Sequence, residues 1–137
     1  MKVTRASDYA IRALIHMAQK PIGTTFMRSE LAGECEIPDS FLGKILQNLA
    51  KSDILSSERG KKGGFKIATE LESITVYDII SAIEGDIALN KCIFDEEFCS
   101  LVHSCTAHVM WGDIQDNLVT MLKSYTLAKL TAKYRAD

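Results

Sequence analysis

The amino-acid sequence predicts a mainly α-helical fold with one small β-hairpin. Three observations predict it. Apolar residues recur at helical spacing in several segments, one pair of short strand-like segments flanks a glycine-rich turn, and no segment is repeated or compositionally biased. At 137 residues the chain can bury a hydrophobic core without disulfide bonds.

The first predicted helix covers about residues 6–19. Its apolar face is formed by residues at positions i, i+3, i+4 and i+7, namely Ile11, Leu14, Ile15 and Ala18. His16 lies off this face and is expected to see water, and Pro21 ends the helix.

Two further helices are joined by a short turn. The first covers about residues 28–34, and Pro38 suits the first turn of the second, which runs from residue 39 to about 52. The apolar face of the second carries Leu42, Ile45, Leu46 and Leu49, and its other face carries Asp39, Ser40, Gly43, Lys44 and Gln47. This is the helix-turn-helix arrangement, whose second helix enters the DNA major groove.

The β-hairpin follows directly. Residues 54–58 and 65–68 read as strands, and the glycines between them permit a tight turn. Its tip carries Arg59, Lys61 and Lys62. Cations on a projecting hairpin next to a helix-turn-helix predict a wing that contacts phosphate or the minor groove. A solvated turn is the alternative, but the order helix, turn, helix, hairpin favours the wing.

Charge is divided unevenly along the chain. The net charge is −2, but residues 1–66 hold eleven Lys/Arg against seven Asp/Glu, a balance of +4, and residues 67–137 hold five against eleven, a balance of −6. This asymmetry indicates an N-terminal module that faces a polyanion and a C-terminal module with another role. Without a signal-like segment or an apolar span of ~18 residues, a cytoplasmic protein without membrane contact is expected.

Helices resume after the wing. Thr75 and Asp78 form a capping-box variant at the start of the next helix, and Gly85 ends that helix. From Thr106 the apolar residues follow heptad spacing: Ala107, Trp111, Ile114, Leu118, Met121 and Tyr125. Such a stripe predicts helix packing between two chains of a homodimer, although packing onto the chain's own core would also accept it. A final helix covers residues 127–134.

Three of the four cysteines lie close together, with the spacing C-x6-C-x5-C for Cys92, Cys99 and Cys105. The first two are expected on an irregular loop and Cys105 at the start of the long helix, with His108 one turn further on. Thiolate ligands suit zinc or an iron–sulfur cluster. Structural zinc sites have two to four residues between paired ligands, so these longer gaps favour a cluster, and zinc binding or direct thiol redox sensing are alternatives.

The fourth ligand has two candidates. His108 lies on the same helix face as Cys105, and Asp8 could reach the site from the partner subunit or from its own DNA-binding half. Asp8 would also simply suit a helix N-terminus. Cys35 reads as a small buried hydrophobe and His103 as a solvent-facing residue. No nucleophile–base pair is present, so an enzyme is not expected.

The segments "SDYAIRALIHMA", "ILSSERGKKGGF" and "CTAHVMWGDIQDNL", together with the three cysteines, resemble the Rrf-type bacterial winged helix-turn-helix transcription regulators, in the IscR/NsrR-like cluster-binding branch. The resemblance covers nearly the whole chain. It implies a dimeric transcription regulator with one iron–sulfur cluster per subunit, either 2Fe-2S or 4Fe-4S. The presence or redox state of the cluster would tune binding to double-stranded promoter DNA.

Residue by residue, the resemblance implies cluster ligands at Cys92, Cys99 and Cys105. The IscR-like fourth ligand falls on His108, whereas the carboxylate ligand of the nitric-oxide sensors falls on Asp8. The resemblance implies DNA contacts at Ser40 and its neighbours on the recognition helix, which include Asp39, and at Arg59 on the wing. The helix-turn-helix and wing patterns add Lys44, Lys61 and Lys62. Where IscR-like regulators carry a glutamate involved in operator choice, this chain has Gly43.

The resulting hypothesis divides the chain into a DNA-binding domain (1–85), a cluster-binding loop (86–105) and a dimerisation region with the final helix (106–137). Its function would be to sense iron–sulfur cluster status, redox state or nitric oxide. A zinc-binding or thiol-sensing regulator without a cluster is the first alternative, and a small iron–sulfur electron-transfer protein is the second.

Overall fold

The structure, a computed structural model, describes residues 3–60 and 63–134. Lys61 and Lys62 lie outside the described residues. The elements follow in the order α1 (Arg5–Met17), α2 (Arg28–Cys35), α3 (Asp39–Lys51), β1 (Leu55–Glu58), β2 (Gly64–Ile67), η1 (Leu71–Ser73), α4 (Val76–Glu84), α5 (Lys91–Phe94), α6 (Thr106–Ser124) and α7 (Leu127–Tyr134). The predicted mainly α-helical fold with one hairpin is confirmed.

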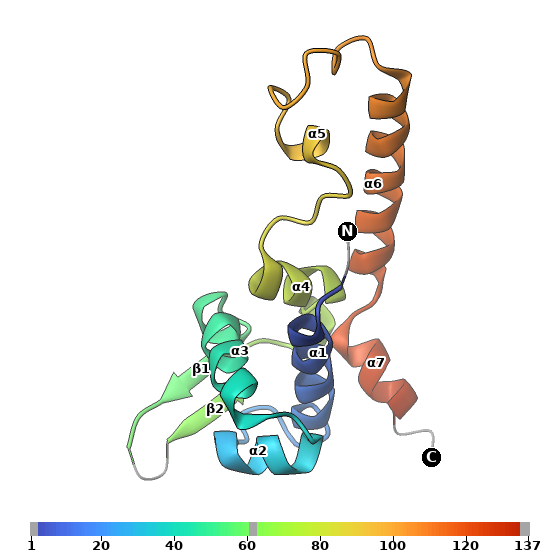
Figure 1. Ribbon diagram of the computed structural model, residues 1–137. Helices are drawn as coiled ribbons and strands as arrows, with labels where there is room; N and C mark the ends of the chain where they lie inside the picture. The colour runs from blue at the N-terminus through green and yellow to red at the C-terminus, as the bar shows by residue number, and fades with distance from the viewer. Residues whose placement is uncertain (1–2, 61–62, 135–137) are drawn as a thin grey trace.

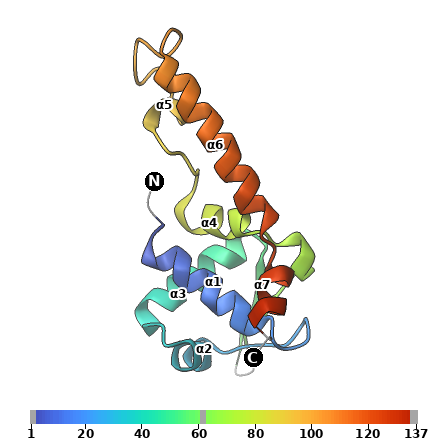
Figure 2. The ribbon, with the colours of Figure 1, turned by 90° about the vertical axis from the view of Figure 1, so that its right-hand side faces the viewer.

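The molecule has a packed head and one long projecting helix. Helices α1 to α4, the hairpin and α7 form the head, and α6 extends away from it with α5 and the following loop beside its far end (Figures 1 and 2). No helix in the described part of the chain is long and apolar enough to cross a membrane.

The core of the head is built from the inner faces of its helices. Fully buried side chains come from α1, α2, α3, β1, α4 and α7: Leu14, Met17, Leu31, Leu42, Leu46, Leu49, Leu55, Ile79 and Leu127. The predicted apolar face of α3 is confirmed. The predicted face of α1 is rotated: Ala10, Ala13 and Met17 are buried with Leu14, whereas Ile11 and Ile15 are only partly buried. The buried face of α1 includes two alanines, because α3 and α4 pack against it.

The helix-turn-helix and the hairpin have the predicted form. Glu36, with a left-handed backbone (φ 55°), ends α2, and Pro38 takes the N-cap position of α3, one residue before its first turn, without a side-chain hydrogen bond. The two strands pair antiparallel, with Leu55 opposite Ile67 and Glu58 opposite Gly64. Phe26 joins the far side of β2 through two 2.8 Å backbone hydrogen bonds with Phe65. The hairpin is therefore fastened to the segment that leads into α2.

The C-terminal helices are tied back to the head. The predicted capping box of α4 is confirmed, with the Thr75 side chain accepting from Asp78 N and Asp78 Oδ2 accepting from Thr75 N. The segment at the start of α4 is also bonded to the junction between α6 and α7. Val76 N donates to Tyr125 O, and Leu127 N donates to Ile74 O, both at 2.8 Å. One end of α6 is thus fixed next to α4.

One element differs from the expectation for residues 86–105. Cys92 lies on α5, a short helix of four residues, and not on an irregular loop. A single helical turn is too short to produce an apolar periodicity, so the sequence contains no pattern that would reveal it.

Candidate functional site

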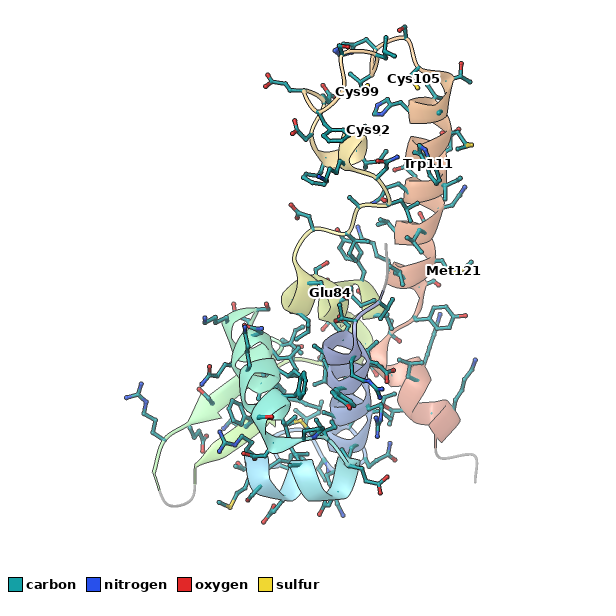
Figure 3. The ribbon with its side chains drawn as sticks, in the orientation of Figure 1. Glu84, Cys92, Cys99, Cys105, Trp111 and Met121 are labelled. Carbon is teal, nitrogen blue, oxygen red and sulfur yellow. The ribbon has the colours of Figure 1, made fainter. Side chains whose placement is uncertain are left out.

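The three cysteines and His108 line one cavity of about 180 Å³ at the far end of α6 (Figure 3). Cys92 comes from α5, Cys99 from the connecting turn, and Cys105 from the position that caps α6. The remaining wall includes Phe98, Val102 and Trp111. The structure therefore brings together the four residues that the spacing C-x6-C-x5-C-x2-H singles out.

Local hydrogen bonds give this region its shape. Val102 N donates to Cys99 O at 3.2 Å, and the Val102 side chain is buried beneath the turn. Cys105 O accepts from His108 N at 3.1 Å, which starts the first turn of α6 and places His108 beside Cys105. These bonds place the donors of the cysteine cavity around a common space.

Gln115 holds the segment that enters the cavity region. Its buried side chain accepts a hydrogen bond from Leu89 N at 3.0 Å and donates one to Ile87 O. The residue was missed in the sequence. The sequence feature that could have revealed it is a polar residue four positions after Trp111, on the side of α6 where apolar residues were expected.

The donor set of the cavity fits a sulfur-ligated cofactor. All three thiols are free and only partly exposed. His108 Nδ1 is buried and has no hydrogen-bond partner among residues 3–60 and 63–134. Burying a ring nitrogen without a partner is unfavourable, and a ligand in the cavity that His108 lines would remove this penalty.

A single metal ion fits the donors less well. In the described part of the chain, no three His, Cys, Asp or Glu side chains converge closely enough to hold one ion. Tetrahedral zinc requires its ligands about 2.0–2.3 Å from one centre.

Asp8 is not part of the cavity within one chain. It is exposed on the first turn of α1, in the head, whereas the cavity lies at the opposite end of α6 (Figures 1 and 3). An Asp8 ligand would therefore have to come from a partner subunit.

The exposed face of α3 carries the polar residues expected there. Ser40, Lys44 and Gln47 are exposed, and Arg59 is exposed at the start of the hairpin turn. Asp39 instead pairs with Arg28, whose Nε lies 3.1 Å from Asp39 Oδ1. Arg28 was not singled out in the sequence, because a lone arginine at the start of a short helix carries no pattern.

Two residues of the α1–α2 contact complete the description. Cys35 is buried as predicted, and burial raises the pKa of its thiol. His16 was expected to face water, and its side chain is 31% exposed; its Nε2 also lies 2.5 Å from Glu34 Oε2. The contact with Glu34 was not predicted, because a contact with another helix leaves no mark in the periodicity of α1.

The apolar residues of α6 lie in two environments. Trp111 and Leu118 are partly buried within the chain, and Trp111 lines the cysteine cavity. Along the adjacent edge Met110, Ile114 and Met121 are 44%, 43% and 62% exposed. We call these three residues, with Ala107 and Tyr125, the α6 stripe.

Comparisons with known proteins agree with the fold. The Rrf2 family model, described as an iron-dependent transcriptional regulator, matches residues 3–133. An HTH-type transcriptional regulator of Haemophilus influenzae is 29% identical over 133 residues, which are 97% of this chain and 88% of the relative.

Solved structures show the same fold. CymR, the global cysteine regulator of B. subtilis, matches with a TM-score of 0.77 at 23% identity, over 97% of this chain and 98% of that chain. The IscR of T. potens matches with a TM-score of 0.73 at 22% identity, over 98% of this chain and 89% of that chain. A transcriptional regulator from Listeria innocua gives 0.77 at 25% identity, over 100% and 90%. The winged-helix architecture predicted from the sequence is thereby confirmed.

Proposed function

This chain belongs to the Rrf2 family of transcriptional regulators, and on that premise we propose that it senses iron–sulfur cluster status, redox state or nitric oxide through a cluster held by Cys92, Cys99 and Cys105. The observation that carries this proposal is the shared cavity of the three thiols with His108, whose buried Nδ1 has no partner in the described part of the chain. When bound, an iron–sulfur cluster would supply a redox-active and nitric-oxide-reactive centre. His108 is the proposed fourth ligand, and Asp8 of the partner subunit is the alternative.

The proposed DNA contacts lie at the other end of the molecule. Ser40 and Lys44 on α3 face outward, and Arg59 begins the turn of the wing. An exposed recognition helix enters the major groove, while cations on a wing add salt-dependent affinity for phosphate. Lys61 and Lys62 are proposed to add to this affinity, and Asp39 to act through Arg28.

The α6 stripe supports a homodimer. A row of exposed apolar side chains on a projecting helix is unfavourable in water, and a second copy of α6 would cover it. Two copies would also present two recognition helices, as two half-sites one DNA turn apart require. We propose that residues 106–137 provide this contact, 86–105 the cofactor site and 1–85 the DNA-binding surface.

The chain offers a direct route from the cavity to the head. Gln115 fixes the backbone at residues 87 and 89, immediately before α5 and Cys92. On the head side, Ser7 Oγ donates to Glu84 Oε2 at 2.5 Å, and Ser7 is fully buried. Glu84 also lines a groove of about 620 Å³ that includes Ser40 and Lys44. A rearrangement of the cysteine segment would therefore reach the recognition helix through α4 and α1.

The test is anaerobic purification of the full chain followed by iron and sulfide analysis, visible absorption and promoter-binding measurements. We expect a coloured protein whose colour and iron are lost when the three cysteines become serine, and whose promoter affinity changes at the same time. The same assays on His108→Ala and Asp8→Ala identify the fourth ligand. A colourless protein that stays free of iron and sulfide after reconstitution would refute the cluster.

A thiol-sensing regulator without a cluster is the second candidate. It is favoured by the three free, partly exposed thiols and by the lack of convergent metal ligands among the described residues. Loss of promoter binding after mild oxidation of a metal-free protein, reversed by dithiothreitol, would support it.

The electron-transfer alternative does not account for the exposed recognition helix and wing. If neutralising Arg59, Lys61 and Lys62 left promoter binding unchanged, the proposed role of the wing would be wrong.

A further inference from the structure

A second groove runs between the recognition helix and the wing. Its volume is about 310 Å³, and its lining includes Arg28, Gly43, Gln47, Gly63 and Gly64. None of the thiols contributes to it. The groove lies on the surface that a duplex would approach if α3 enters the major groove and the wing contacts the backbone.

Arg28 occupies this groove although its position on α2 is electrostatically unfavourable. It is the first residue of α2, where the positive end of the helix dipole disfavours a cation. The ion pair with Asp39, at 3.1 Å, offsets this repulsion and ties the side chain to the start of α3. The side chain remains 53% exposed. The ion pair is made through Nε, and the exposed end of the guanidinium, with its two Nη atoms, can bond an external acceptor.

Gly43 gives the guanidinium its place across α3. A Cβ at this position would lie 3.1 Å from Arg28 Nη1 and 3.5 Å from Arg28 Cδ. The arginine therefore covers the outward face of the recognition helix where α3 itself has no side chain. A bulky residue at position 43 would displace it.

The wing fixes the backbone from which Arg28 projects. Phe26 N donates to Phe65 O and Phe65 N donates to Phe26 O, both at 2.8 Å. The approach is so close that a Cβ at Gly64 would lie 2.4 Å from Phe26 O. Three features therefore position Arg28: the backbone pairing of Phe26 with the wing, the ion pair with Asp39, and the space left by Gly43.

We propose that Arg28 is a specificity-determining residue, whose Nη atoms read a base edge in the major groove from across Gly43. The recognition surface would then take a principal base-reading group from α2 and not from α3. A guanidinium presented end-on bonds two acceptors at once, which matches the O6 and N7 atoms of guanine. This inference rests on the proposed DNA-binding role.

The test begins with selection of duplexes from a random-sequence library by the full-length wild-type protein. Affinities of Arg28→Ala for the selected duplex and for a scrambled one are then compared by fluorescence anisotropy. Loss of one bidentate base contact lowers the preference for the selected duplex about tenfold or more. We expect Arg28→Lys to lose most of that preference as well, because an ammonium cannot make the paired contact. Lys20→Ala, which removes an exposed cation from the turn after α1, is the matched control and should leave the preference unchanged.

A double-mutant cycle separates displacement of Arg28 from other effects of filling the groove. Gly43→Leu should lower the preference in the wild-type background and have little effect in Arg28→Ala, because its target is already gone. Equal losses in both backgrounds, or equal losses by Arg28→Ala on selected and scrambled duplexes, would overturn the reading role. A wild-type protein that enriches no duplex would overturn the operator-binding role itself, and Arg28 with it.

Discussion

Replacing Gln115 with leucine should release the segment that precedes Cys92 while leaving the head folded. Leucine has a similar size but can neither accept from Leu89 N nor donate to Ile87 O, so two backbone groups lose their partners. A net hydrogen bond contributes about 0.5–1.5 kcal/mol, and an unsatisfied buried group costs about 1–3 kcal/mol. Because Leu89 is only partly buried and water can reach it, we expect a loss of about 2 kcal/mol in local stability.

Hydrogen exchange read by mass spectrometry measures this loss. A decrease of about 2 kcal/mol in the local opening free energy corresponds to about thirtyfold faster exchange. The increase should be confined to amides near residues 87–94, with α1 and α3 unaffected. Trp111, the only tryptophan in the sequence and a residue of the cavity wall, provides a second, fluorescent probe.

Asn117→Ala is the control for Gln115→Leu, because Asn117 is exposed on the same helix and should show wild-type exchange. Unchanged exchange at residues 87–94 in Gln115→Leu would refute the idea that this side chain anchors the cysteine segment. Faster exchange throughout the head would also refute it, since that would indicate global destabilisation.

Three further predictions concern the α6 stripe, the wing and Cys35. Ile114→Glu, which puts a charge into the stripe, should convert a dimer into a monomer in size-exclusion chromatography with light scattering, whereas Asp113→Ala should not; a persistent dimer would exclude the stripe as the interface. Gly64→Ala should cost about 1–3 kcal/mol in urea unfolding, because the new Cβ would clash with Phe26 O at 2.4 Å; an unchanged midpoint would contradict the close approach. Cys35 should react with a maleimide more slowly than the other cysteines, since burial raises its pKa. The same raised pKa stabilises the fold below the unfolded-state value near 9.0, and this contribution should be lost as the pH rises through the folded pKa in alkaline urea titrations.

Local rules explain which elements could be predicted. The capping box at Thr75, the apolar face of α3 and the glycines of the hairpin are encoded within a few neighbouring residues, so the sequence alone indicates them. The cysteine cavity was also indicated, because the positions of Cys105 and His108 on one helical turn follow from helix geometry.

Long-range contacts explain what the sequence did not reveal. Gln115 bonds the backbone at Ile87, which is 28 residues away, and His16 meets Glu34 at a separation of 18 residues. The position of Arg28 depends on Asp39 and on the absence of a side chain at Gly43. Such partners are chosen by the packing of helices and leave no periodic trace in either segment.

The return of α7 into the head has a consequence for biosynthesis. Leu127 is fully buried in the same core as Leu14 and Leu42, and the backbone at Tyr125 and Leu127 is bonded to Val76 and Ile74 at the start of α4. While only the first four helices have been synthesised, the core of the head therefore lacks the packing of α7. The apolar side chains that α7 covers stay exposed to water until α7 emerges from the ribosome. Nascent chains of this protein should consequently bind chaperones until translation is nearly finished, and fragments cut before α7 should aggregate.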